Sequence, residues 1–293
     1  MTEAAGERGR IGVIGGSGLY EMPDLADVEE VALDTPFGPP SDAYILGTLG
    51  GRPMAFLARH GRGHVLTPTE VNFRANVYDM KLLGVERILS VSAVGSLREE
   101  IHPADVVFPD QFIDRTTKRA ASFFGDGVVA HVPLAHPVCP EVLETYVRAA
   151  GKMGVACHEG GAYVCIEGPQ FSTRAESFLY RSWGVSVIGM TNVTEAKLAR
   201  EAEICYGTIA LVTDYDCWHE DEEHHVSTEA VVAILTQNVE RARGIIREVV
   251  AGLPESRSCA CGRALEGAIL TAPDRIPPEA KERLMPLIGK YVQ

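Results

Sequence analysis

Three short apolar runs in this 293-residue chain each stop at a small polar loop. Residues 11–14 precede the loop 15–18, residues 54–58 precede 59–61, and residues 87–91 precede 92–96. Short apolar runs closed by such loops are typical of the buried strands of an α/β sheet. Because ligands of such sheets bind beyond the carboxyl ends of the strands, we expect the three loops to converge on one pocket.

The residue types in these loops favour an anion, and we predict phosphate. Glycines expose backbone N–H groups, Ser17 and Ser92 add hydroxyls, and Arg59 adds a fixed fork of positive charge. Taken singly, the loops have simpler interpretations. Gly-Gly-Ser-Gly alone is a tight turn, and the basic segment 58–64 alone is a solvated loop.

Composition and charge exclude several classes of protein. The net charge of −13 argues against nucleic acid or an anionic membrane as the main partner. No apolar run approaches about 18 residues, so we expect no membrane-spanning helix. Residues 1–10 lack the apolar core of a signal segment and are expected to be flexible, which favours a cytoplasmic protein.

Strand-like and helix-like segments alternate to about residue 250 without a linker, which predicts one α/β domain over residues 1–293. Helices are predicted at 67–83 (capped by Thr67), 141–152, 193–203, and from a cap at Ser227 to Gly252. Residues 253–293 form a C-terminal extension with a short helix at 279–288.

The seven cysteines are an odd and scattered set. Cys165 and Cys205 stand in apolar surroundings and are expected in the core. Cys259 and Cys261 form a CxC pair, but no second pair with metal-ligand spacing accompanies it. Two surface thiols and a disulfide or redox pair remain the alternatives for this segment.

Two carboxylates follow the strand-like run 209–213, at Asp214 and Asp216. Crowding and burial would raise the pKa of at least one of them, and a protonated carboxyl suits adenine, which presents an N7 acceptor beside an N6 donor. Phe171 and Ser172 follow the run 162–166, where Phe171 either stacks on a flat base or faces the core. The competing readings of the two acids are a metal site and a solvated turn.

Two other functions were weighed. Gly16-x-Gly18 suggests a dinucleotide site, but Glu21 stands where that fingerprint needs Gly or Ala. Residues 219–225 look like a metal tract, which together with Cys259 and Cys261 would suit a metal or redox sensor. The favoured interpretation of that tract is a polar loop before the long helix, with a lid as one use for it.

Long blocks in one order resemble the S-methyl-5′-thioadenosine phosphorylase family of the trimeric purine nucleoside phosphorylase superfamily. They are IGVIGGSG (11–18), DTPFG (34–38), PSDA (40–43), ARHGR (58–62), GSLREE (95–100), DQFIDRTT (110–117), IEGP (166–169), RAES (174–177) and TDYDCW (213–218). The resemblance implies a nucleoside phosphorylase-like fold, in which helices flank a central mixed β-sheet.

The resemblance also implies roles for individual residues, with Asp214, Ser17 and His60 as the catalytic set. The phosphate would be held by Ser17, Arg59, His60, Ser92, the backbone N–H of Ala93 and Thr191. The nucleoside would contact Phe171, Ser172, Met190, Asp214, Asp216, His131, Thr228, Val231 and Val232, the last four at its 5′ end. Ser92 stands where relatives often carry Thr, and the segment before Thr228 varies in length.

The implied reaction is reversible phosphorolysis of S-methyl-5′-thioadenosine to adenine and 5-methylthioribose 1-phosphate. Inorganic phosphate is then a co-substrate, and no metal or organic cofactor is implied. A 6-oxopurine such as methylthioinosine is the alternative substrate, which Asp rather than Asn at position 214 disfavours. The resemblance further implies a homotrimer, or a hexamer of two trimers, with shared active sites. The CxC tail resembles those of thermophile relatives, which favours the disulfide.

Overall fold

The apolar runs of the sequence lie side by side as parallel strands in the middle of a sheet. The computed structural model describes residues 9–219 and 228–292, apart from the side chains of Ser17, Tyr20 and residues 228–237. Strand β1 (Arg10–Gly15) pairs in parallel with β4 (Arg52–Ala58) and with β5 (Val85–Ser96). Strand β11 (Cys205–Asp214) pairs in parallel with β5 on its other side. The carboxyl ends of β1, β4 and β11 therefore point toward the same edge, which the longer β5 crosses.

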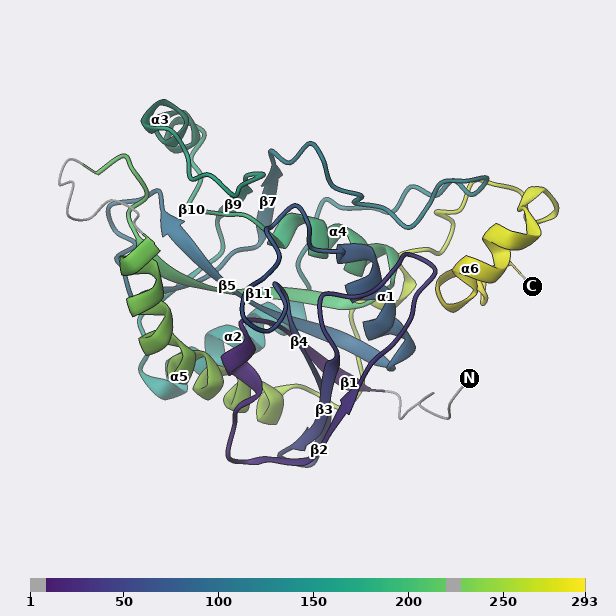
Figure 1. Cartoon of the computed structure of the whole chain (residues 1–293), viewed down its shortest axis with the longest axis horizontal. Helices are drawn as coiled ribbons and strands as arrows, with labels where there is room; N and C mark the ends of the chain where they lie inside the picture. The colour runs from purple at the N-terminus through teal and green to yellow at the C-terminus, as the bar shows by residue number, and fades with distance from the viewer. Residues whose placement is uncertain (1–8, 220–227, 293) are drawn as a thin grey trace.

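In the described part of the chain the sheet has eleven strands and is mixed (Figure 1). Antiparallel β3 and β2 extend it beyond β4, whereas β10, β9 and β7 continue it from the end of β5. Strand β6 pairs antiparallel with β11, and β8 pairs with β6. The bounds are β2 (Leu25–Val31), β3 (Tyr44–Leu49), β6 (Val106–Phe108), β7 (Gln111–Asp114), β8 (Cys157–Glu159), β9 (Ala162–Cys165) and β10 (Val187–Gly189).

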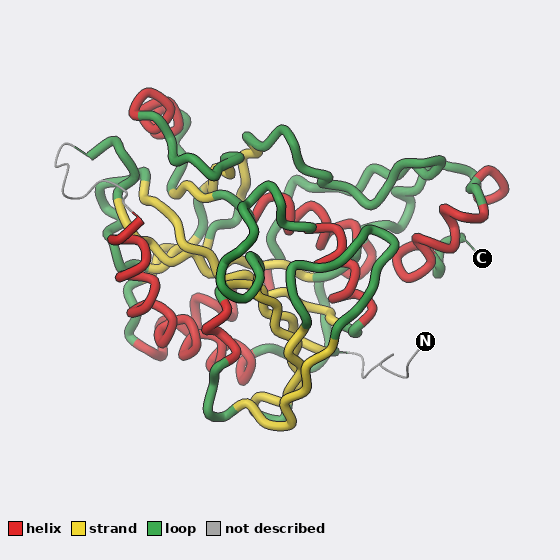
Figure 2. The backbone as a smooth tube through the Cα atoms, viewed as in Figure 1, coloured by secondary structure: helices red, strands yellow, loops and turns green. Residues whose placement is uncertain are grey.

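Helices cover both faces of the central strands (Figure 2). On one face α2 (Pro140–Met153) packs against α5 (Thr228–Gly252), and on the other α1 (Phe73–Leu82) packs against α4 (Asn192–Glu201). Helix α6 (Pro278–Ile288) packs against α1, whereas α3 (Arg174–Ser182) follows β9. Short 3₁₀ turns are η1 (Ser17–Tyr20), η3 (Ala260–Arg263) and η4 (Pro273–Arg275).

The alternation of side chains along the central strands fills two apolar clusters. Leu89 and Val91 of β5 join the cluster under α2 and α5, whereas Ile88 joins the one under α1, α4 and α6. Successive residues of a strand point to opposite faces, so β5 contributes to both cores. The predicted arrangement, a mixed sheet with helices on both faces, is confirmed.

Two local predictions were wrong. The helix expected from Thr67 begins at Phe73, because Thr67 and Glu70 close a separate turn and Asn72 caps the helix by accepting the Ala75 N–H at 3.2 Å. The expected loop 92–96 is the end of β5, since it finds pairing partners in β11 and β10. The expected cap at Ser227 lies outside the described residues.

The C-terminal extension returns to the body of the molecule through α6. Leu284 and Ile288 of this helix are fully buried in the cluster that α1 and α4 also fill. No described helix combines the length and apolar character needed to cross a membrane.

We expect Leu284→Ala to lower the free energy of unfolding by about 2–5 kcal/mol, because a fully buried leucine leaves a cavity when truncated. Chemical denaturation followed by circular dichroism measures the change. Its neighbour Met285 is 44% exposed, so Met285→Ala is the matched control and should change stability by less than about 1 kcal/mol. Equal losses in the two variants would contradict the packing of α6.

Candidate active site

The two predicted loops after β1 and β4 and the end of β5 converge on one cavity of about 770 Å³ beyond the strand ends. Gly16 follows β1, Arg59 and His60 follow β4, and Ser92 and Ala93 lie on β5, all in the wall of this cavity. The wall also contains Phe171, Ser172, Met190, Thr191, Asp214 and Asp216. Residues from distant parts of the chain that were predicted to share a site therefore do share one.

Arg59 is almost fully buried, at 3% exposure, and its guanidinium is held by the protein itself. Nε donates to Glu195 Oε1 at 2.5 Å and Nη2 to Glu195 Oε2 at 3.1 Å, so the pair is bidentate. Nη1 donates to the carbonyl of Val91 at 2.8 Å, and Nη2 also donates to the hydroxyl of Ser90 at 2.6 Å. The solvated-loop interpretation of Arg59 is wrong, because its charge is internal and matched by Glu195.

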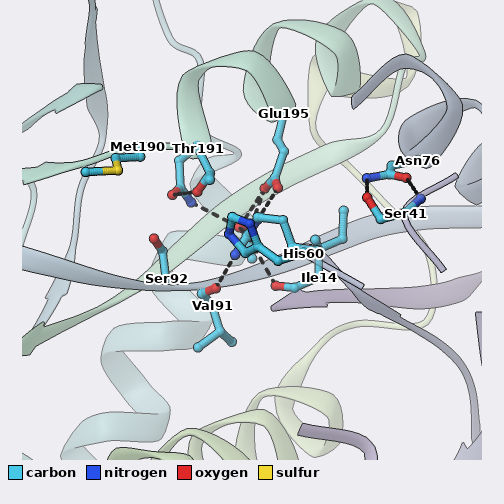
Figure 3. A network of polar contacts seen from close by, with 12 residues as sticks. Ile14, Ser41, His60, Asn76, Val91, Ser92, Met190, Thr191 and Glu195 are labelled. Atoms are coloured by element: carbon cyan, nitrogen blue, oxygen red, sulfur yellow. Dashed lines mark hydrogen bonds and ion pairs between the residues drawn. The ribbon is translucent and has the colours of Figure 1, made fainter. Parts of the chain in front are cut away.

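Glu195 is the acceptor at the centre of a wider polar network (Figure 3). Its carboxylate also accepts hydrogen bonds from the hydroxyls of Ser90 at 2.8 Å and Tyr206 at 2.9 Å. The Asn192 amide donates to Ser90, Tyr206 and Thr208 at 2.9–3.0 Å. Figure 3 shows Glu195 reaching from α4 toward the point where Val91, Ser92 and His60 gather. The network fixes Arg59 before any ligand arrives.

His60 is a neutral imidazole in this setting. Burial and the neighbouring Arg59 lower the pKa of His60 to about 4. Its Nδ1 lies 2.8 Å from the carbonyl of Leu66, which only accepts, so Nδ1 carries the proton. The ring stacks on His64 at 4.3 Å. Nε2 is then a bare acceptor, and the His60 ring brings no positive charge to the cavity.

Thr191 and Met190 enter the cavity from the loop before α4. Thr191 is the N-cap residue of α4 and 4% exposed, so the positive end of the helix dipole faces the cavity. Arg119 holds the adjoining backbone: Nη1 donates to the carbonyl of Met190 at 2.5 Å, and Nε donates to Glu167 at 3.0 Å. Arg119 therefore positions the Met190 segment without lining the cavity.

At the other end of the cavity Asp214 is 5% exposed and Asp216 is 3% exposed. The pKa of Asp214 is raised to about 6, chiefly by burial and less by the charge of Asp216, while hydrogen bonds from Thr213 and Asp216 oppose the rise. The carboxylate accepts from the hydroxyl of Thr213 at 2.6 Å and from the N–H of Asp216 at 2.8 Å. Gly95 faces it across β5, where a Cβ would come within 2.9 Å of Asp214 Oδ1. The predicted rise in pKa is confirmed, and the solvated-turn interpretation is wrong.

Phe171 and Ser172 complete the same end of the cavity. Phe171 is 46% exposed and lines the wall, so the core-facing interpretation of this aromatic is wrong. The Ser172 hydroxyl is buried and has no hydrogen-bond partner among the described residues. An aromatic side chain, a hydroxyl without a partner among the described residues, and two buried carboxyls therefore line the same cavity.

Several predicted site residues are not placed in this cavity. His131 is exposed and outside its wall, where its backbone N–H donates to Ala268. The side chains of Ser17, Thr228, Val231 and Val232 are outside the described part of the structure. Most of the polar tract 219–225, residues 220–225, also lies outside the described residues.

Sequence reasoning missed Glu195 and Arg119, which position the site without forming its wall. Glu195 follows Asn192 by three residues on α4, which begins one residue before the predicted helix 193–203, so both occupy one helix face. That spacing was the available signal for Glu195, because an arginine expected inside the protein, Arg59, needs a buried acid as its partner. Arg119 lies in an irregular segment between β7 and α2. No helix or strand periodicity predicts the neighbours of its side chain there, because they are determined only by the tertiary fold.

Metal binding does not explain the paired carboxylates. Among the described residues, the group that gathers metal-ligating side chains closely enough consists of Cys139, Cys205, Cys259 and Cys261, and it does not include Asp214 or Asp216. The aspartates instead face an organic-sized cavity.

Comparison with known proteins agrees with this geometry. The sequence model of the Phosphorylase superfamily matches residues 10–251. S-methyl-5′-thioadenosine phosphorylase from Koribacter versatilis is 60% identical over 281 residues, which cover 96% of each chain. Among solved structures, a methylthioadenosine phosphorylase from an antarctic soil metagenomic library is 50% identical, with a TM-score of 0.91 over 96% of this chain and 99% of that chain.

A structure solved with a bound base is similar as well. The methylthioadenosine phosphorylase of Schistosoma mansoni in complex with adenine is 36% identical, with a TM-score of 0.84 over 89% of this chain and 99% of that chain. Both the extent of these matches and their identity exceed what a shared fold alone produces. The chain belongs to the phosphorylase superfamily and, within it, to the S-methyl-5′-thioadenosine phosphorylase family.

Proposed function

We propose that this enzyme catalyses reversible phosphorolysis of S-methyl-5′-thioadenosine, giving adenine and 5-methylthioribose 1-phosphate for salvage. The observation that carries the proposal is the buried Asp214, whose pKa is raised to about 6, in the same cavity as Arg59, His60 and Thr191. One end of the cavity then suits a purine and the other an anion. The names of the relatives support the same reaction.

The phosphate is assigned to the end formed by the strand loops. Its donors are the hydroxyls of Ser92 and Thr191, the backbone N–H of Ala93, the N-terminus of α4 and the remaining hydrogen-bonding capacity of Arg59. Ser17 belongs to the same group by its position after β1. The neutral His60 accepts a hydrogen bond through Nε2 from a phosphate oxygen that keeps its proton.

The purine is assigned to the end formed by Phe171, Ser172, Asp214 and Asp216, with Met190 beneath the ribose. Protonated Asp214 donates to N7 of the departing base, which neutralises the charge that develops as the glycosidic bond breaks. Phosphate held below the anomeric carbon stabilises the positive charge that develops on the sugar. In this scheme the reaction draws on no metal and no organic cofactor.

We expect Asp214→Asn to lower kcat/KM for S-methyl-5′-thioadenosine by about 10²–10⁴-fold, the usual contribution of a general acid. An amide cannot present the O–H and C=O pair that matches adenine, whereas its N–H₂ suits a 6-oxopurine. Methylthioinosine is therefore the control substrate, and kcat/KM for it should fall much less. Equal losses on the two substrates would overturn the role of Asp214.

The same residue gives a pH dependence with a defined sign. The active form of Asp214 is protonated, so kcat/KM for the adenine substrate should fall as pH rises above about 6. Asp214→Asn should lack this descending limb. Phosphate ionises in the same range but affects both enzymes alike, so the ratio of the two profiles isolates Asp214. A pH-independent ratio would contradict the assignment.

We expect phosphate to stabilise Glu195→Gln more than the wild type. Removing the carboxylate leaves the buried guanidinium of Arg59 without its counter-ion, which costs about 3–5 kcal/mol and lowers the melting temperature. A bound phosphate then replaces the missing negative charge. Thermal melts with phosphate, or with chloride at equal ionic strength, measure the difference.

The matched control for that experiment is Glu201→Gln, on the same helix. Glu201 is also buried, but it accepts from Ser122 and Phe123, and it does not line the cavity. Phosphate should raise the melting temperature of Glu201→Gln by no more than it raises that of the wild type. A phosphate effect of the same size in all three proteins would contradict the placing of phosphate at Arg59.

We further propose a homotrimer, alone or paired as a hexamer, in the cytoplasm. Three apolar side chains of the α3 region are about half exposed, Phe178 at 48%, Leu179 at 47% and Trp183 at 44%, which supports an interface there. The exposed His131 is assigned to the 5′ end of a neighbouring subunit's cavity. The free cysteines agree with a reducing compartment.

Light scattering tests the oligomeric state. We expect it to give three or six times the chain mass of 31.7 kDa.

Mixed oligomers test the shared site. Asp214→Asn and His131→Ala chains, each impaired alone, should together regain activity, because some interfaces then combine an intact Asp214 with an intact His131. If His131 served its own chain's cavity, the mixture would show only the sum of the separate activities.

A further inference from the structure

Four cysteines far apart in the sequence meet at the end of the sheet opposite the cavity. Cys139 precedes α2, Cys205 begins β11, and Cys259 and Cys261 lie at η3 in the C-terminal extension. Their sulfur atoms all lie within 4.8 Å of one another. The interpretation of Cys259 and Cys261 as two surface thiols is wrong, because Cys261 is 4% exposed and Cys259 is partly buried.

The spacing of the sulfur atoms distinguishes this cluster from a set of disulfides. The four are free thiols, and Cys205 Sγ lies 3.4 Å from Cys259 Sγ, whereas a disulfide needs about 2.05 Å. Zinc binds thiolates at about 2.3 Å, which puts the sulfurs of a regular tetrahedron about 3.8 Å apart. Four sulfurs within 4.8 Å of one another need only small shifts to reach that geometry.

The charges around the cluster favour thiolates. Arg200 Nη1 lies 3.9 Å from Cys261 Sγ, and Arg200 has no carboxylate within 4.0 Å among the described residues. Arg257 interacts with Cys205 and also pairs with Glu86 at 3.4 Å. A complex of one divalent cation and four thiolates has a net charge of −2, which these guanidinium groups offset.

Arg87 supplies an independent observation. It is 0% exposed, and its three guanidinium nitrogens have no hydrogen-bond partner among the described residues. Arg87 is the register partner of Cys205 across β5 and β11, so both side chains project to the same face of the sheet. Glu141 interacts with Arg87 through its charge, and the Oε2 atom of Glu141 also has no hydrogen-bond partner among the described residues. A buried cation beside four sulfurs is stabilised when that cluster becomes anionic.

We propose that Cys139, Cys205, Cys259 and Cys261 bind one zinc ion in a closed tetrathiolate site. Binding replaces the four S–H protons, which pass to solvent, and changes no oxidation state. The site joins the C-terminal extension to α2 and β11. Cys205 begins β11 and Asp214 ends it, so the metal lies about 30 Å from the base-binding carboxyls. It is therefore structural, with no open position for a substrate.

Cobalt titration of the metal-free, reduced wild-type protein tests the proposal directly. We expect one cobalt ion per chain, with the strong visible and near-ultraviolet absorption of tetrahedral cobalt thiolate, and displacement of cobalt by one equivalent of zinc. Absence of a stoichiometric thiolate spectrum would overturn the site. A second result would also overturn it. Mass spectrometry of the protein purified without reductant would show these cysteines joined as disulfides, and neither the oxidised nor the reduced protein would take up metal.

Variants identify the ligands. Cys261→Ser should abolish the thiolate spectrum at one equivalent of cobalt or shift it to that of a three-sulfur site, and zinc should no longer raise the melting temperature as it does for the wild type. Cys157→Ser is the matched control, since Cys157 of β8 is outside the cluster, and it should bind metal normally. Activity should remain near that of the wild type in both variants at a temperature where both are folded. Unchanged cobalt binding in Cys261→Ser would overturn the assignment.

Discussion

The buried pair of Arg59 and Glu195 is the interaction on which the rest of the site depends. It joins the end of β4 to α4, and through Ser90 and Val91 it reaches β5 as well. A buried ion pair stabilises a structure only when its geometry is good and the remaining hydrogen bonds are satisfied, and here Ser90 and Tyr206 supply them. The elements that carry the groups proposed to bind phosphate are thereby fixed relative to one another before a ligand enters.

Low polarity has opposite effects at the two ends of the cavity. Around His60 it removes a positive charge, since burial holds the pKa of this imidazole near 4. Around Asp214 it favours the protonated acid, since burial raises the pKa of this carboxyl to about 6. Both shifts favour the neutral, hydrogen-bonding form of the side chain over its charged form. The chemistry of the cavity therefore rests on which atom holds a proton and only weakly on net charge.

The sequence predicted those features that follow from local pattern. The ends of the central strands at Gly15, Ala58 and Asp214 were located because a buried strand must stop where polar residues begin. The start of α1 was misplaced, since the turn closed by Thr67 and Glu70 imitates a helix cap. Glu195 and the four-cysteine cluster escaped detection because only the folded chain completes them: Arg59 and Ser90 are more than fifty residues from Glu195, and Cys139 and Cys205 are more than fifty residues from the CxC pair.

At the proposed phosphate site, the tautomer of His60 has a consequence for how oxyanions would be distinguished. With its Nδ1 proton committed to the Leu66 carbonyl, the ring offers a lone pair to the ligand and no donor. Phosphate near neutral pH still carries an acidic hydrogen that matches this lone pair. Sulfate is nearly the same size and shape but has none, so it would bring two acceptors face to face. Selection between two tetrahedral dianions then rests on a single hydrogen atom that arrives with the correct one.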